Sequence, residues 1–264
     1  MRLVWTTDIH LNHADFQAWD DWAGQIDRAR PDAILITGDL SEGDDVSFQL
    51  RRLGETFDAD VFFVLGNHDF YGTSIAEGRR HAVAAVREIP SLHYLTDQSP
   101  IELTPGRFLI GDDGWGDATE GDYENSIVRL NDFTAIRDFR ESESAAWPRL
   151  LRDQGHQSAQ RIARKLNSVV GDAHEIVVAT HVPPFRESCW YEGKTTDDHW
   201  APFFVCGAVG STLKQFAFEN PNIRTTVLCG HTHHGGTAQM AENLVVLTAS
   251  AEYGRPSVER VFDW

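Results

Sequence analysis

Seven side chains able to bind a metal ion follow strand-like segments of this sequence. Each comes soon after an apolar run, as where Val61 to Leu65 precedes Gly66-Asn67-His68-Asp69. The seven are Asp8, His10, Asp39, Asn67, His181, His231 and His233. They combine carboxylate and amide oxygens with imidazole nitrogens, a mixture that first-row divalent metals accept. Seven donors exceed the needs of one ordinary transition metal, so the set predicts two metals that share a bridging carboxylate.

The runs before these side chains have the composition of buried β-strands. Five segments are rich in β-branched and aromatic residues and contain no charge: 3–7, 33–37, 61–65, 176–180 and 225–229. Continuous apolar runs are typical of strands buried on both faces. In an open α/β sheet, ligands bind outside the carboxyl ends of the strands. We therefore expect the seven side chains to meet at one edge, although they lie far apart in the sequence.

The first third of the chain alternates between strands and helices. Apolar residues recur at three- and four-residue steps in 16–26, 46–53 and 75–88, which predicts an amphipathic helix after each of the first three strands. This alternation requires crossover connections and predicts a mainly parallel sheet. Three short apolar runs then predict antiparallel strands at a sheet edge. They lie at 92–95, 101–103 and 108–110, between prolines and a glycine.

Two irregular regions occupy much of the remaining chain. Residues 112–170 begin as a polar segment and continue as a helical pattern that Pro148 and Gly155 interrupt. Residues 183–205 form a long loop, and long loops in compact domains are often functional. We interpret both as insertions in a single domain of residues 1–264, because α/β domains often reach this length. Further elements are predicted at 211–218 (helix), 244–247 and 258–262 (strands).

Composition limits the classes of partner. The chain has 23 basic and 40 acidic residues, and its net charge of −17 disfavours nucleic acid or anionic membrane as a tight partner. No apolar run approaches the roughly 20 residues of a membrane span, and the first residues lack a signal-peptide pattern. Cys189, Cys206 and Cys229 lack paired spacing and fit reduced thiols. We predict a cytoplasmic protein, while its oligomeric state stays open.

The order of the motifs resembles that of the calcineurin-like metallophosphoesterase superfamily. The family pattern is Asp-x-His, Gly-Asp-x-x-(Asp/Glu), Gly-Asn-His-(Asp/Glu), His and Gly-His-x-His, and the chain matches it from Asp8 to His233. The resemblance implies an α/β fold of four layers, in which two mixed β-sheets pack face to face with helices outside. It also implies one metal held by Asp8, His10, Asp39 and His233, and a second held by Asp39, Asn67, His181 and His231.

The resemblance further implies hydrolysis of a phosphomonoester or phosphodiester, with a metal-bridging hydroxide as the nucleophile. Two metals can activate a shared water and neutralise phosphoryl oxygens, and the donors favour manganese, iron or zinc. His68 is not assigned to a metal, and its family equivalent assists the leaving group, a task that suits an imidazole. Glu42 matches a position that orients this histidine in some branches; alternatively it is an exposed loop acid. Asp69 is expected to shape the loop or support a ligand.

The substrate is predicted to be small, phosphorylated and nucleotide-like. Cations able to hold phosphate and aromatics able to stack on a base occur near the motifs, although packing is the alternative role for each aromatic. They are Arg186, Lys194 and Arg255, and Trp115, Trp190, Tyr191 and Trp200. Gly43 and Leu65 stand where the superfamily's protein phosphatases carry arginines, which disfavours a protein substrate. Two other functions stay open: a nuclease acting on single-stranded nucleic acid, and a non-catalytic metal-binding scaffold.

Overall fold

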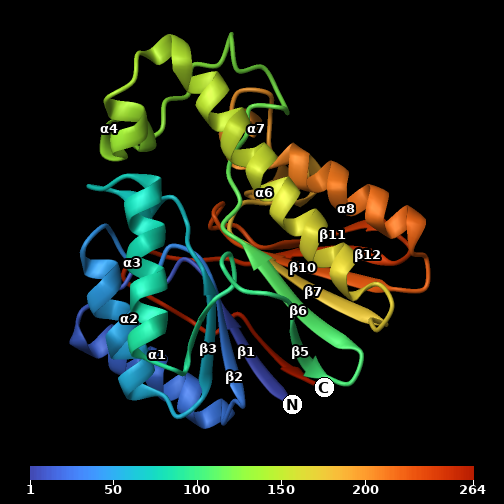
Figure 1. The fold of residues 1–264 in the computed structure, drawn as a ribbon. Helices are drawn as coiled ribbons and strands as arrows, with labels where there is room; N and C mark the ends of the chain where they lie inside the picture. The colour runs from blue at the N-terminus through green and yellow to red at the C-terminus, as the bar shows by residue number, and fades with distance from the viewer.

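Two β-sheets form the centre of the computed structural model, which describes residues 1–264 (Figure 1). The first sheet has the strand order β13-β1-β2-β3-β4, and the second has the order β11-β12-β10-β7-β6-β5. The first contains β1 (Arg2–Thr6), β2 (Ala33–Thr37), β3 (Asp60–Val64), β4 (Leu92–Tyr94) and β13 (Arg260–Asp263). The second contains β5 (Ile101–Thr104), β6 (Arg107–Asp112), β7 (Glu175–Thr180), β10 (Arg224–Cys229), β11 (Gly236–Ala241) and β12 (Leu244–Thr248). A separate hairpin joins β8 (Trp190–Tyr191) to β9 (Lys194–Thr195).

Helices cover the outer face of each sheet. Those over the first sheet are α1 (Phe16–Ala29), α2 (Asp45–Thr56) and α3 (Ile75–Glu88). Those over the second are α6 (Trp147–Val169) and α8 (Gly207–Glu219). The shorter helices are α4 (Asp132–Ala135), α5 (Arg137–Arg140) and α7 (Ala201–Phe204), with 3₁₀ turns η1 (His68–Phe70), η2 (Ser144–Ala146) and η3 (Arg186–Ser188). The segment with α4 and α5 rises above the carboxyl ends of the strands (Figure 1). No helix is both long and apolar enough to cross a membrane.

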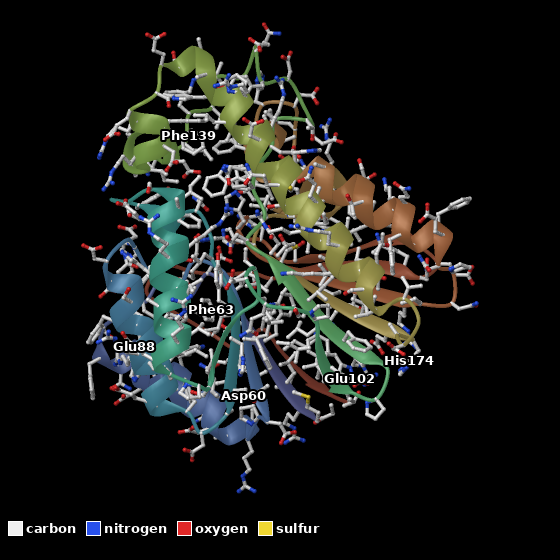
Figure 2. All side chains as sticks on the ribbon, in the orientation of Figure 1. Asp60, Phe63, Glu88, Glu102, Phe139 and His174 are labelled. Atoms are coloured by element: carbon white, nitrogen blue, oxygen red, sulfur yellow. The ribbon has the colours of Figure 1, made fainter.

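Successive side chains of each central strand point alternately to the other sheet and to the helices, which explains the layered arrangement. Leu3 and Trp5 of β1 belong to the core between the sheets, whereas Val4 packs on the helix side. In β3, Phe62 lies between the sheets and Phe63 lies beside α3 (Figure 2). Successive side chains point to opposite faces, so a strand between two apolar layers must be apolar at every position. The four-layer arrangement that the resemblance implied is therefore confirmed.

Local sequence patterns predicted strands β1 to β3 and the helices after them better than the strands of residues 92–110. Strands β1 to β4 are parallel, and α1, α2 and α3 confirm the three predicted helices. The prediction of antiparallel strands over 92–110 holds only for β5 with β6, because β4 is parallel to β3 and β6 is parallel to β7. The chain passes from one sheet to the other between β4 and β5. Nothing in the local pattern marks that passage.

Helix α6 runs unbroken from Trp147 to Val169, so the prediction of an interrupted helix was wrong. Pro148 stands in the first turn, where its missing N–H would have no partner in the helix anyway. Gly155 is buried where α6 approaches Asp117, and a β-carbon there would lie 2.3 Å from the Asp117 Cβ. This glycine therefore permits a close contact and does not end the helix. The pattern also missed β11 and the β8–β9 hairpin.

Candidate metal centre

The seven predicted ligands lie just beyond the carboxyl ends of five strands. Asp8 and His10 follow β1, while Asp39 and Asn67 follow its parallel neighbours β2 and β3. His181 follows β7 of the second sheet, and the loop after β10 holds His231 and His233. The two sheets bring these loops together. The Nε2 atoms of His10 and His233 are 3.2 Å apart, and His181 Nε2 is 3.1 Å from His231 Nδ1.

One group of donors forms around Asp8. Its Oδ1 lies 3.3 Å from His233 Nε2, and its Oδ2 accepts a hydrogen bond from Thr7 Oγ1 at 2.7 Å. One donor atom from each of Asp8, His10, Asp39 and His233 lies within 4.8 Å of the others. Metal–ligand distances of about 2.0–2.2 Å are normal for nitrogen and carboxylate donors. The four donors are therefore close enough to surround one divalent ion.

A second group shares Asp39 with the first. His181 Nε2 lies 3.4 Å from Asp39 Oδ2 and 3.2 Å from Asn67 Oδ1. The other carboxylate oxygen, Asp39 Oδ1, accepts a hydrogen bond from the His68 backbone N–H at 2.9 Å. This bond leaves Oδ2 between His181 and His10, whose Nε2 is 3.7 Å away. The geometry suits a carboxylate oxygen that bridges two ions.

The backbone conformations of the candidate ligands test whether these residues fit metal ions. Eight non-glycine residues of the chain have positive φ, and five of them are Asp8 (46°), His10 (37°), Asp39 (51°), His231 (69°) and His233 (57°). Such conformations cost on the order of 1–3 kcal/mol each and persist where a site requires them. Strain concentrated on mixed oxygen and nitrogen donors fits a pair of divalent ions.

Burial in the cluster keeps His10 and His231 neutral, the form in which an imidazole nitrogen can bind a metal. Burial lowers the pKa of His10 to about 4 and the pKa of His231 to about 3, so both rings are neutral near pH 7. Burial also opposes the charging of His181, but the Asp39 and Asp8 carboxylates outweigh it and raise the pKa of His181 to about 10. A cation at this position must displace that proton and would replace it as the counter-charge of the buried carboxylates.

His68 lies beside the cluster and outside both donor groups. Its ring centroid is 4.8 Å from that of His10, and its side chain is 16% exposed. The Nδ1 atom lies 3.3 Å from Glu42 Oε1, and the Nε2 atom lies 3.4 Å from the Tyr253 hydroxyl. Glu42 is therefore placed where its carboxylate can orient the imidazole.

Asp69 connects the loop after β2 to the loop after β3 through hydrogen bonds to backbone N–H groups. Its Oδ1 accepts from the Ser41 N–H at 3.0 Å, and its Oδ2 accepts from the Gly66 N–H at 2.8 Å. Burial and the nearby Asp39 carboxylate raise the pKa of Asp69. A β-carbon on Gly66 would lie 2.2 Å from Asp39 Oδ1, so only glycine allows these loops to approach so closely.

Two of the three candidate substrate cations, Arg186 and Arg255, pair with nearby carboxylates. Arg186 Nη1 donates to Asp198 Oδ1 at 2.7 Å, a bond that joins two parts of the loop after β7. Arg255 pairs with Glu252 three residues earlier and is 77% exposed. Lys194 is exposed on β9. None of these contacts places a cation against the cluster.

The aromatic candidates divide between core and surface. Trp115 is buried and packs against Phe70 and Phe139 in the core, which favours the packing role for this side chain. Trp190 is half-buried against Gly236. Tyr191 is 60% exposed, with its ring centroid 4.7 Å from that of His234. Trp200 is exposed and packs on Phe204, whose ring centroid is 4.4 Å from that of His231.

Sequence analysis missed Tyr253 and Asp132. The Tyr253 ring centroid lies 4.3 Å from that of His10. Tyr253 follows β12, which is parallel to β10, so the rule that found the ligands could have found it too. Asp132 belongs to α4, and its Oδ1 accepts from Asn67 Nδ2 and from the Tyr71 hydroxyl, both at 2.8 Å. These bonds leave Asn67 Oδ1 facing His181, and no sequence pattern marks Asp132 for this role.

Fold and site together define the class of protein. The chain belongs to the calcineurin-like phosphoesterase family, whose model matches residues 1–235. Among solved structures it is similar to phosphopantetheinyl hydrolase (PptH) from Mycobacterium tuberculosis, with 15% identity, a TM-score of 0.65, and coverage of 96% of this chain and 90% of that chain. It is also similar to a dimetal phosphatase from Danio rerio, with 14% identity, a TM-score of 0.57, and coverage of 95% and 87%. The corresponding values for TT1561 from Thermus thermophilus are 15%, 0.55, 94% and 88%. Comparison with curated proteins finds no matching sequence.

Proposed function

We propose that this phosphoesterase hydrolyses its substrate with two divalent ions held by the seven clustered donors. The observation that supports this most is the pair of donor groups on either side of Asp39 Oδ2. Asp8, His10 and His233 would complete one position, and Asn67, His181 and His231 the other. When bound there, the ions would supply Lewis-acid stabilisation of the phosphoryl oxygens and activation of a water molecule. The donor set suits manganese, iron or zinc.

Proton transfer to the leaving group is assigned to His68, with Glu42 and Tyr253 beside it. Glu42 Oε1 lies next to His68 Nδ1 at 3.3 Å, so Nε2, on the side of the Tyr253 hydroxyl, is the nitrogen that can serve a substrate. We assign His68 Nε2 as the proton donor to the leaving oxygen, a task that requires hydrogen-bond reach and a ring held in one orientation. The Tyr253 hydroxyl, 3.4 Å from Nε2, would contact the same leaving group and keep bulk water from it.

The favoured substrate is a small phosphomonoester or phosphodiester with a nucleotide-like leaving group. Exposed Tyr191 and Trp200 lie close to the His231–His234 loop and can stack on an aromatic group. The acidic balance, with a net charge of −17, disfavours a polyanionic nucleic-acid substrate. Three buried, unpaired cysteines are consistent with a reducing compartment, and we propose the cytoplasm.

The experiment is hydrolysis of p-nitrophenyl phosphate and bis-p-nitrophenyl phosphate by metal-stripped protein. Manganese, iron, zinc or magnesium is added back to the wild type, to Asp39→Ala and to Asp44→Ala. Asp44 is an exposed acid of the same loop and serves as the matched control. We expect metal-restored turnover in the wild type and in Asp44→Ala, and none in Asp39→Ala. The preferred ester then distinguishes phosphatase from phosphodiesterase.

The two alternatives predict different results in the same assay. A non-catalytic scaffold would hold two metals per chain and turn over neither ester. A nuclease would cleave a single-stranded oligonucleotide faster than either small ester, with a rate that falls steeply as salt increases.

A further inference from the structure

A crevice between α3 and α6 gathers basic side chains in an acidic protein. α3 covers the first sheet and α6 covers the second, so the crevice lies where the two halves of the fold meet (Figure 1). Two adjoining hollows of about 550 and 380 Å³ share Thr96, Asp97 and Arg161 in their walls. Six cationic side chains line them: Arg79, Arg80, Arg87, Arg161, Arg164 and Lys165. The whole chain has 23 basic and 40 acidic residues, so this concentration departs strongly from the average surface.

Buried carboxylates hold two of these arginines in fixed positions. Asp113, with 1% of its side chain exposed, accepts from Arg79 Nε at 2.9 Å. Asp112 is fully buried and accepts from Arg161 Nη2 at 3.1 Å as well as from its Nε. The terminal nitrogens of Arg79 and the Nη1 of Arg161 donate to no group of the chain. These two guanidinium groups are therefore oriented in advance and still have N–H groups to offer.

The other cations of the crevice are mostly without ionic partners. Arg87 and Arg164 form no ion pair, and Arg80 has only a 3.8 Å contact with Glu77. Lys165 Nζ donates to the carbonyl oxygens of Leu95, Thr96 and Gly111. Burial, aided by repulsion from Arg161, lowers the pKa of Lys165 to about 8, although Asp112, Asp113 and Asp97 act in the opposite direction. The charges of Arg87 and Arg164, which have no ionic partner in the chain, would be offset by a bound anion.

We propose that this crevice binds a small anion with more than one phosphate group, such as pyrophosphate or the polyphosphate of a nucleotide. Each hollow has the size of a small-ligand pocket, for which volumes of about 300–1,000 Å³ are usual. Guanidinium groups bind phosphate oxygens through paired N–H donors. A single phosphate would neutralise only part of a surface that extends over two hollows. None of the metal-centre donors lines the crevice, so this site is separate from the phosphoesterase centre.

The test is calorimetric titration of the full-length protein with inorganic pyrophosphate. It is carried out on the wild type with its metals and on Asp39→Ala, because pyrophosphate would also bind metals in the phosphoesterase centre. We expect a saturable site of one pyrophosphate per chain that persists in Asp39→Ala and weakens as salt increases. Citrate, a multivalent carboxylate, should bind at least tenfold more weakly.

Two matched triple variants assign the binding to the crevice. Arg80→Gln/Arg87→Gln/Arg164→Gln removes exposed crevice cations that have no buried partner, and should weaken pyrophosphate binding at least tenfold. Arg140→Gln/Arg149→Gln/Arg152→Gln removes three exposed charges from α5 and the first turns of α6 and should leave the affinity unchanged. Circular dichroism verifies that both variants are folded, and Arg87→Gln/Arg164→Gln replaces the first triple if it is not. Absence of a site in Asp39→Ala, equal losses in the crevice and control variants, or equal affinity for citrate would overturn the proposal.

Discussion

Removal of Asp132 offers a sharp test of how the second donor group is held. Asp132 comes from α4, a short helix above the strands, and only 5% of the residue is exposed. One of its oxygens accepts both the Asn67 amide and the Tyr71 hydroxyl. In Asp132→Ala, Asn67 Nδ2 retains only a 3.4 Å contact with Tyr71. The amide can then rotate and turn Oδ1 away from His181.

The expected size of the effect follows from these contacts. A partner that orients a metal ligand is typically worth about 10- to 100-fold in metal affinity, or about 1.4–2.8 kcal/mol. Each buried donor left without an acceptor also costs about 1–3 kcal/mol of folding free energy. Part of that cost is offset because burial raises the pKa of Asp132, which shows that its charge is itself unfavourable here. Asp132→Asn keeps one oxygen able to accept both donors, so it should retain most of the metal affinity.

The assay is metal content per chain after dialysis against increasing chelator concentrations. We expect the wild type to retain two metals at a chelator concentration at which Asp132→Ala retains one. Asp138→Ala is the matched control, because Asp138 lies on the neighbouring α5 and its Oδ2 accepts from the Ile75 N–H at 2.8 Å, at the start of α3. That variant should lose stability and keep both metals. Equal metal retention in Asp132→Ala and the wild type, or equal loss in both variants, would refute the orienting role of Asp132.

Four further predictions test other parts of the site. His68→Ala should lower turnover by about 10²–10⁴-fold with unchanged metal content by mass spectrometry, since His68 belongs to neither donor group; metal loss in this variant would make His68 structural. Gly66→Ala should abolish binding of both metals, because the new β-carbon would lie 2.2 Å from Asp39 Oδ1. Gly72 is the control, since it has a φ of 79° and no atom lies within 4 Å of the position of a β-carbon. Gly72→Ala should lower the free energy of unfolding, measured with denaturant, by only about 1–2 kcal/mol. Chelation should lower the melting temperature, and metal at about 100 times its dissociation constant should restore about 2.7 kcal/mol; an unchanged melting temperature would contradict a site in the folded state. Burial raises the pKa of Cys189 and Cys229 to about 12, so these thiols should resist iodoacetamide at pH 8 until the protein unfolds, and rapid alkylation of the folded protein would contradict this.

The sequence by itself determined the elements whose pattern is local. The helices α1, α2 and α3 follow from apolar residues at helical spacing, and the α3 start also carries a capping box of Ser74 and Glu77. The candidate ligands were found because each follows an uncharged strand, and parallel strands end at the same edge of a sheet. Strand, loop and ligand are adjacent in the chain, so no tertiary information was needed to connect them.

Only the tertiary structure decided which surfaces meet. An apolar run such as Ile34-Leu35-Ile36 indicates that both faces are buried, but it does not reveal that one face meets a second sheet and the other meets helices. The same limit applies to Asp132, which reaches Asn67 across 65 positions, and to Trp115, whose aromatic ring suits a core as well as a substrate site. It applies also to the basic crevice, because α3 and α6 become neighbours only when the two sheets pack. Side-chain type and spacing specify what a residue can do, whereas packing between distant segments decides which partner it finds.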